Sequence, residues 1–349
     1  MSLQPTQNLN INKVEPLPAP KALKEKYPMS EASVKLVVKT REEIQNIILR
    51  KDKRMILIVG PCSIHDEKAA MEYAEKFKKA YDKYSDRLCL IMRVYFEKPR
   101  TTIGWKGLIN DPHMNNSFDV IEGLSRARRI LMKITEMGIP TATEMLDPIV
   151  PQYISDLVSW AAIGARTTES QTHREMASGL SMPVGFKNGT DGNMQTAIDA
   201  MTSAKNPHSF LGINQDGQTC VVRTKGNQFG HIILRGGHDR PNYDKESIRA
   251  AVEKLKAAGL NTQVMVDCSH ANSEKKHEKQ EVVWKSVIEQ RVAGNMDLLG
   301  MMLESNLNEG NQKIPADLSQ LKYGVSVTDA CVNWETTERL LQFAYDQLK

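Results

Sequence analysis

Residues 91–107 contain side chains that can bind an anion. The segment follows a short apolar run at 88–92 and continues as a loop. This loop carries three cations and two hydroxyl groups: Arg93, Lys98, Arg100, Thr101 and Thr102. Pro99 prevents a helix across the loop and favours an extended backbone at Lys98. Arginine offers a planar pair of donors, lysine a compact charge and threonine a neutral donor. The loop is therefore suited to a phosphorylated or carboxylated molecule, although the same pattern alone also describes an ordinary solvated loop.

Charged or metal-capable side chains also follow the other short apolar runs, at the position where each run ends. In chain order these residues are Cys62, Arg93, Glu144, Arg166, Lys187, Arg235, Asp267 with His270, and Glu304. Continuous apolar runs that alternate with amphipathic helices are typical of parallel strands covered by helices. Eight such units predict a closed (β/α)8 TIM barrel of the α/β class. Because the carboxyl ends of barrel strands share the face that carries active sites, we expect these residues to meet there.

The apolar runs and the amphipathic stretches place the elements of this barrel. The strands are expected at 55–59, 88–92, 140–143, 161–165, 183–186, 231–234, 264–266 and 298–303. The helices are expected at 30–50, 66–84, 120–137, 148–158, 171–180, 193–204, 244–258, 281–293 and 334–348. One segment, 210–224, interrupts the alternation and predicts an inserted β-hairpin that turns at Asp216 and Gly217. We therefore divide the chain into an N-terminal extension, 1–54, and a barrel, 55–349, with the hairpin inserted at about 208–228.

Five of the candidate cations would converge on this face without matching carboxylates: Arg93, Lys98, Arg166, Lys187 and Arg235. These five cations would repel one another unless an anion with several charges lay among them. A phosphate together with a carboxylate would satisfy them. Any one of these residues, taken singly, could instead form an ion pair at the rim of the barrel.

A second set combines a thiol, an imidazole and two carboxylates: Cys62, His270, Glu304 and Asp329. Soft and hard ligands together favour Mn, Fe, Co or Zn over Mg or Ca. A divalent ion there could polarise a carbonyl oxygen. The alternatives are that Cys62 is a small buried apolar residue and His270 a core histidine. Cys268 is a rival ligand, but it is expected to pack within its strand.

Composition restricts the class of protein. The chain has 349 residues, a hydrophobic fraction of 40% and a net charge of only +4, which does not indicate a nucleic-acid-binding protein. No apolar run is long enough to span a membrane, and no signal peptide is recognised. Five scattered cysteines fit the reducing cytoplasm. The first 25 residues or so, with alternating prolines at 16, 18 and 20, predict an extended arm, either disordered or docked on a neighbouring subunit.

Six motifs give the sequence a close resemblance to type I 3-deoxy-D-arabino-heptulosonate 7-phosphate (DAHP) synthases. They are GPCSIHD at 60–66, MRVYFEKPRT at 92–101, GARTTES at 164–170, PVGFKNGTD at 183–191, HIILRGG at 231–237 and VDCSHAN at 266–272. The resemblance implies the first reaction of the shikimate pathway, in which phosphoenolpyruvate condenses with D-erythrose 4-phosphate. Residues 1–25 and 313–321 depart from the family pattern or vary within it.

The resemblance also implies roles for individual residues. Phosphoenolpyruvate would be bound by Arg93, Lys98, Arg166, Lys187 and Arg235, with Glu144 and Ala165 nearby. Erythrose 4-phosphate would be bound by Arg100 and Thr101. The divalent metal would lie on Cys62, His270, Glu304 and Asp329. The catalytic residues would be Lys98, Cys62 and His270. We expect Lys98 to donate or relay a proton, with its pKa lowered by Arg93 and Arg100.

Regulation and assembly are implied in the same way. An aromatic amino acid inhibitor, with tyrosine expected, would bind at Pro148, Gln152, Leu180, Ser181, Phe210, Gly212 and Val222. The phenylalanine-sensitive relatives carry serine at the position of Gly212, and a missing side chain leaves room for a phenolic hydroxyl. The alternative is that Gly212 serves a turn or bulge. Resembling enzymes are homo-oligomers, either dimers or tetramers.

Three other functions remain open from the residues. The first is an octulosonate phosphate synthase, which performs the same chemistry on a longer sugar. The second is an aldolase that uses Lys187 as a Schiff-base nucleophile. The third is a non-catalytic phosphosugar sensor, which would not need metal ligands.

Overall fold

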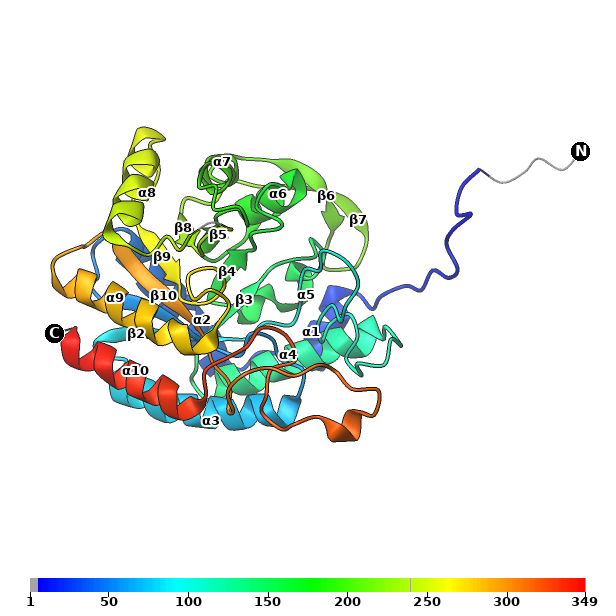
Figure 1. Ribbon diagram of the computed structural model, residues 1–349. Coiled ribbons are helices and arrows are strands. Elements are labelled where there is room, and N and C mark those ends of the chain that lie inside the picture. Colours follow the sequence, from blue (N-terminus) through cyan, green and yellow to red (C-terminus); the bar gives the residue numbers. More distant parts are fainter. Residues whose placement is uncertain (1–5, 239, 349) are drawn as a thin grey trace, which may run out of the picture.

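Eight parallel strands form a closed barrel in the computed structural model, which describes residues 6–238 and 240–348 (Figure 1). The barrel strands are β1 (Met55–Gly60), β2 (Leu88–Arg93), β3 (Thr141–Glu144), β4 (Trp160–Ile163), β5 (Val184–Lys187), β8 (Gly230–Leu234), β9 (Val264–Asp267) and β10 (Leu298–Glu304). Their order around the barrel is β1-β10-β9-β8-β5-β4-β3-β2. The (β/α)8 prediction is confirmed.

The strands are apolar throughout because both of their faces are buried. On β1, Met55, Leu57 and Val59 belong to the apolar layer between the strands and the helices. The alternate residues Ile56 and Ile58 belong to a second cluster inside the barrel. Successive strand residues point to opposite faces, so a continuous apolar run is what such a strand requires.

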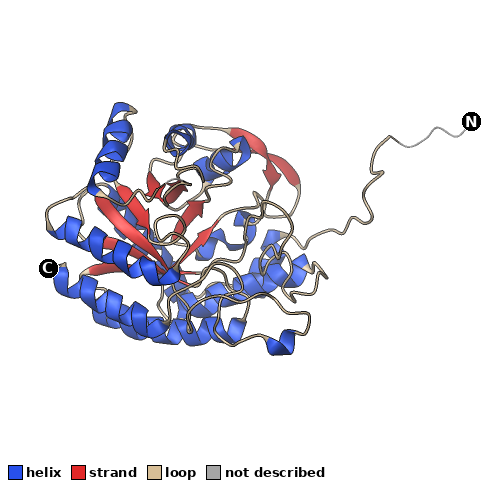
Figure 2. Ribbon diagram, in the orientation of Figure 1, coloured by secondary structure: helices blue, strands red, loops and turns tan. Residues whose placement is uncertain are grey.

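The helices surround these strands, as Figure 2 shows. They are α1 (Pro20–Lys26), α2 (Glu31–Ile48), α3 (Glu67–Tyr84), α4 (Val120–Glu136), α5 (Pro151–Ile154), α6 (Gln171–Gly179), α7 (Gln195–Ala204), α8 (Lys245–Ala257), α9 (Gln280–Val292) and α10 (Trp334–Gln347). Short 3-10 turns lie at Ser155–Leu157, His277–Lys279 and Leu318–Gln320. Polar caps begin several helices; Asp66, for example, accepts hydrogen bonds from the Lys68 and Ala69 amides at the start of α3.

Helix α2 closes the amino end of the barrel. Its Ile44, Ile47 and Ile48 are buried in the same apolar cluster as the interior residues of the strands. Its Arg41 donates hydrogen bonds to the carbonyls of Ser155 and Val158, just before β4 begins. The amino end of the barrel is therefore filled by apolar side chains.

Two predicted segments differ from the structure. The helix expected at 148–158 is reduced to α5 and one 3-10 turn. Pro151 favours the first turn of a helix, so the helix starts late, and the chain must turn into β4 at Trp160. The extended arm predicted up to about residue 25 instead contains α1, which begins at Pro20 and buries Leu23. Residues 6–19 do extend away from the barrel, while 1–5 lie outside the described residues (Figure 1).

The inserted hairpin consists of β6 (Ser209–Ile213) and β7 (Thr219–Arg223), which pair antiparallel. It lies beside the N-terminal extension. The Gln215 carbonyl accepts a hydrogen bond from the Lys21 amide, and the Gln215 side chain donates to Gln152. Within 6–238 and 240–348, no helix combines the length and the apolar character that crossing a membrane requires.

Candidate active site

A cavity opens at the carboxyl ends of the barrel strands. Its lining includes nine of the predicted substrate residues: Arg93, Lys98, Arg100, Thr101, Glu144, Ala165, Arg166, Lys187 and Arg235. It also includes the predicted metal ligands His270, Glu304 and Asp329, while Cys62 is buried with its Sγ 3.8 Å from Asp329 Oδ2. The structure therefore brings residues from all eight strand ends into one place.

Arg93 lies at the floor of this cavity and is fully buried. Its Nη2 donates to Glu304 Oε1 at 3.2 Å and its Nε to the Pro61 carbonyl at 3.3 Å. The guanidinium stacks on the ring of Tyr95, with 4.0 Å between its central carbon and the ring centroid. These contacts fix the planar group, and its Nη1 has no protein partner. Arg93 is thus oriented to give that donor to a ligand.

Lys98 lies above the buried cysteine, and its Nζ donates to the Cys62 carbonyl at 3.2 Å. Our expectation that its pKa is lowered is wrong. Burial opposes the ammonium, but Cys62, Glu304 and Asp329 outweigh that effect and raise the pKa of Lys98. Glu304 and Asp329 lie far from Lys98 in the sequence but close to it in the barrel, where β1 alone separates β10 from β2, so neighbours in sequence were a poor guide. Lys98 therefore stays a cation.

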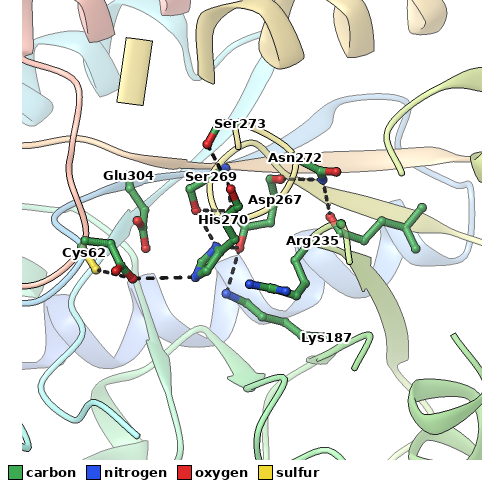
Figure 3. Close-up of polar contacts among 12 residues, drawn as sticks. Cys62, Lys187, Arg235, Asp267, Ser269, His270, Asn272, Ser273 and Glu304 are labelled. Carbon is green, nitrogen blue, oxygen red and sulfur yellow. Dashed lines mark hydrogen bonds and ion pairs between the residues drawn. The ribbon is translucent and has the colours of Figure 1, made fainter. Parts of the chain in front are cut away.

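Lys187 forms a buried ion pair with Asp267, with 2.8 Å between Nζ and Oδ2 (Figure 3). Burial alone would raise the pKa of Asp267, but Lys187 and His270 hold it well below its usual value. An ammonium paired in this way is a poor nucleophile, which argues against the Schiff-base aldolase.

The predicted sugar-phosphate residues lie at the exposed rim. Arg100 Nε donates to the Trp105 carbonyl at 2.8 Å, and Arg166 Nε donates to the Thr101 hydroxyl at 3.1 Å. The contact between Arg166 and Thr101 joins the rim loop to the end of β4. The rim loop and the end of β4 could therefore bind two anionic groups, from different substrates, side by side.

The ligand atoms of Cys62, Glu304 and Asp329 all lie within 4.8 Å of one another. His270 borders this group, with Nε2 4.0 Å from Asp329 Oδ2. Cys268, the rival ligand, is fully buried in the apolar layer outside the barrel. Burial raises the pKa of the Cys62 thiol to about 12, with Glu304 adding to the effect. A cation is therefore needed to bind it as a thiolate.

Unpartnered buried polar atoms concentrate at this cavity. Among the described residues seven such side-chain atoms occur, and four of them belong to Arg93, Tyr95, Glu144 and Glu304. Buried polar groups normally have a partner, so these atoms mark a place where a ligand, ion or water binds. Gly164 permits part of this arrangement, because a Cβ there would lie 2.2 Å from Glu144 Oε1. The donor set fits a divalent metal beside a multivalent anion.

Comparison with known proteins identifies the family of the chain. The model of the DAHP synthetase I family matches residues 30–342. The chain belongs to the DAHP synthetase I family.

Relatives in this family match nearly the whole chain. The Tyr-sensitive phospho-2-dehydro-3-deoxyheptonate aldolase of Escherichia coli K12 is 53% identical over 341 residues, which cover 98% of this chain and 96% of that protein. The Phe-sensitive enzyme of the same organism is 51% identical over 335 residues, covering 96% and 95%. The solved structure of the aldolase from Francisella tularensis SCHU S4 has a TM-score of 0.94 and 50% identity, covering 97% of this chain and 98% of that one. The chain is accordingly a DAHP synthase by family, a transferase of aromatic biosynthesis.

The residues expected to bind an inhibitor lie away from this cavity, at the hairpin. Phe210, Gly212 and Val222 share its half-buried face. A Cβ on Gly212 would lie 2.8 Å from Val222 Cγ2 and 3.6 Å from the Phe210 ring. The remaining members are Pro148, just before α5, Gln152, within α5, and Leu180 and Ser181, after α6. Gln152 reaches the hairpin through Gln215, and α6 packs against β6.

We expected Asp267 on this face from the sequence but gave it no role, and Tyr95 and Glu97 were not expected in the site. Tyr95 stacks under Arg93, Asp267 pairs with Lys187, and Glu97 is buried on the loop that carries Lys98. Asp267 had a usable signal, since it ends its strand as the ligands do. Tyr95 and Glu97 had none, because an aromatic or acidic residue within a loop is ordinarily a matter of packing or solvation.

Proposed function

We propose that the chain condenses phosphoenolpyruvate with D-erythrose 4-phosphate, giving DAHP and phosphate, in a reaction that depends on a divalent metal ion. The supporting observation is one cavity that holds six cationic side chains next to a cysteine–glutamate–aspartate ligand group. A phosphosugar sensor would need the cations but not the ligands.

The metal would be held by Cys62, His270, Glu304 and Asp329. The mixture of thiolate, imidazole and carboxylate favours Mn, Fe, Co or Zn. When bound, the ion would polarise the aldehyde oxygen of the second substrate. The unpartnered Glu304 Oε2 and the short distances among the ligand atoms support this set.

Phosphoenolpyruvate would be bound deep in the cavity. Its phosphate and carboxylate would lie among Arg93, Lys98, Arg166, Lys187 and Arg235, with Glu144 and Ala165 beside them. Because Arg93 and Lys187 are already fixed by Glu304 and Asp267, little side-chain freedom is lost on binding. Holding the enol in line with the aldehyde supplies the entropic part of catalysis.

Erythrose 4-phosphate would place its phosphate on Arg100 and Thr101 and extend its aldehyde toward Lys98. Carbon 3 of phosphoenolpyruvate then bonds to the aldehyde carbon, and Lys98 donates a proton to the oxygen that becomes a hydroxyl. Water adds at carbon 2, and the bond between carbon 2 and the phosphate oxygen breaks. One phosphate leaves for each DAHP formed.

The test is identification of the product from both substrates. A seven-carbon sugar acid phosphate should form with one phosphate released per phosphoenolpyruvate consumed. Preference for a five-carbon sugar phosphate would favour the octulosonate phosphate synthase, and trapping of substrate on Lys187 by borohydride would favour the Schiff-base aldolase.

We further propose feedback inhibition, with tyrosine as the inhibitor, at Pro148, Gln152, Leu180, Ser181, Phe210, Gly212 and Val222. Identities of 53% and 51% to the Tyr- and Phe-sensitive relatives do not separate the two by themselves. The choice of tyrosine therefore depends on Gly212, where a Cβ would lie 2.8 Å from Val222 Cγ2, so that any side chain would change the face on which a phenolic hydroxyl is expected.

We also propose a cytoplasmic homo-oligomer. The extension 6–19 carries four exposed apolar side chains, Leu9, Ile11, Val14 and Leu17. Pro18 at its base is bound through its carbonyl by the Tyr153 hydroxyl at 2.8 Å. An arm that is anchored at one end and apolar beyond it is suited to docking on a second copy. All five cysteines are unpaired, as a reducing compartment favours.

A further inference from the structure

Asp267 joins the two halves of the candidate site. It ends β9, is fully buried, and uses one oxygen for two partners (Figure 3). Its Oδ2 lies 2.8 Å from Lys187 Nζ and 3.1 Å from His270 Nδ1. The first partner belongs to the group that would bind the anion, and the second would be a metal ligand.

The carboxylate cannot rotate away from these partners. Its Oδ1 accepts hydrogen bonds from the Ser269 amide at 3.0 Å and the Ser269 hydroxyl at 2.7 Å. Its backbone carbonyl accepts from Asn272 Nδ2 at 2.9 Å. Both oxygens are therefore committed, and the position of Oδ2 is set by the chain itself.

The contact with His270 decides how the imidazole faces the metal ligands. When Nδ1 carries the proton and donates to the carboxylate, Nε2 keeps its lone pair and faces Asp329. His270 also has a left-handed backbone, with φ of 60°. A residue in that conformation depends on its surroundings to hold it in place. The Ser269 hydroxyl, 2.7 Å from Nδ1, is the other group that touches this nitrogen.

The contact with Lys187 keeps an ammonium in a cavity that is already positive. Lys187 is almost fully buried and shares the cavity with Arg93, Arg166 and Arg235. Without the carboxylate, like charges would repel the ammonium, and it would lose the buried counter-charge that now pairs with it.

We propose that Asp267 is a positioning residue that couples the anion site to the metal site, because a single carboxylate oxygen orients both Lys187 and His270. This inference depends on the proposed function, since it requires that phosphoenolpyruvate and a metal bind where we place them. Coupling of this kind is reciprocal: phosphoenolpyruvate changes the affinity for the metal by the same factor by which the metal changes the affinity for phosphoenolpyruvate.

The test measures binding rather than turnover. Chelated protein is titrated with Mn²⁺ and with phosphoenolpyruvate, each alone and in the presence of the other. Asp267→Asn should weaken Mn²⁺ binding by about 10- to 100-fold, the usual effect of removing the partner of a metal-bound histidine. It should also weaken phosphoenolpyruvate binding by about tenfold, because a buried charge loses its partner. The coupling factor, by which each ligand changes the affinity for the other, should approach one.

Two further variants separate positioning from general damage. Ser269→Ala removes the hydroxyl that fixes Asp267 Oδ1 and touches His270 Nδ1, so it should weaken Mn²⁺ binding and, by a smaller factor than Asp267→Asn, phosphoenolpyruvate binding as well. Ser273→Ala removes a hydroxyl 3.3 Å from the His270 carbonyl in the same loop, and it should change neither affinity. If circular dichroism shows that Asp267→Asn does not fold, the same two affinities are measured in Ser269→Ala instead.

Two results would overturn the inference in different ways. Folded Asp267→Asn with both affinities and the coupling factor unchanged refutes the coupling while leaving the proposed function intact. A parent protein that binds neither Mn²⁺ nor phosphoenolpyruvate refutes the proposed function, and the inference with it.

Discussion

Some cationic side chains of the candidate site are paired with a carboxylate, and others are not. Arg93 is paired with Glu304 and Lys187 with Asp267, both within 3.2 Å. Over the part of the chain that the structure describes, Arg100, Arg166 and Arg235 form no such pair with a carboxylate. The paired cations provide fixed geometry, and the unpaired ones provide the net positive charge that two phosphorylated substrates need.

Arg100→Ala should separate the two substrates. The side chain lies at the rim and is expected to contact only the sugar phosphate, so KM for erythrose 4-phosphate should rise by about tenfold or more. KM for phosphoenolpyruvate should change by less than about twofold. Steady-state kinetics with each substrate varied in turn checks this, with Thr102→Ala as the control on the same loop. Equal changes in both constants would mean that the two substrates are assigned to the wrong positions.

Glu97 makes stability depend on pH. Burial, together with Asp147 and Glu144, raises the pKa of Glu97 from 4.5 to about 8. Between these values the folded protein keeps a proton that the unfolded chain has lost. The free energy of unfolding should therefore fall as pH rises through this range, by at most about 1.4 kcal/mol per pH unit. Glu97→Gln has no such proton and should lose this contribution.

Denaturant unfolding at several pH values between about 5 and 8 measures the effect. The free energy of unfolding of the parent, minus that of Glu97→Gln, should decrease steadily as pH rises. Parallel curves for the two proteins would show that Glu97 does not titrate in this range.

At the scale of elements, the barrel was predictable and its irregular parts were not. The buried runs of β1 and β2 and the Asp66 cap of α3 are local signals, and the structure has them where the sequence predicts. Helix α1 depends on burying Leu23 against the barrel, and α5 is shortened because the chain must turn into β4. The burial of Leu23 is a contact between distant segments, which no local pattern contains, whereas the late start of α5 follows Pro151, a local signal that the prediction did not use.

The candidate site was likewise predictable from the sequence in part. The ends of the strands predicted which side chains would meet, because the topology of a parallel barrel determines that face. The pKa of Lys98 depends on Cys62, Glu304 and Asp329, and the role of Asp267 depends on Lys187, which is 80 residues away in the sequence. Such pairs are visible only after the chain has folded.

The hairpin is the element that we expect to set inhibitor specificity. Tyrosine should lower initial rates at micromolar to millimolar concentration, phenylalanine less, and tryptophan hardly at all. Gly212→Ser should weaken the effect of tyrosine and strengthen that of phenylalanine, because the added Cβ would lie 2.8 Å from Val222 Cγ2 and force this face of the hairpin to change. Initial rates with each amino acid check this. Inhibition of the parent by phenylalanine alone would contradict the role assigned to Gly212.

For the whole molecule, the apolar side chains of 6–19 lead us to expect assembly through the N-terminal arm. Sedimentation velocity at micromolar concentration should give a dimer or tetramer. Removing residues 1–17 should lower the mass of the main species or weaken its association, since the exposed apolar groups are lost. Only monomer in the parent would refute the assembly, and an unchanged species after truncation would refute the role of the arm.

The central claim is that metal ligands and cations in one cavity perform the condensation together. The most direct measurement is the rate of DAHP formation from both substrates before chelation, after chelation, and after Mn²⁺, Co²⁺ or Fe²⁺ is restored. We predict that chelation abolishes the rate, that at least one of these ions restores it, and that folded Cys62→Ala stays inactive with every ion. Full activity in the chelated protein, or in Cys62→Ala, would contradict the account.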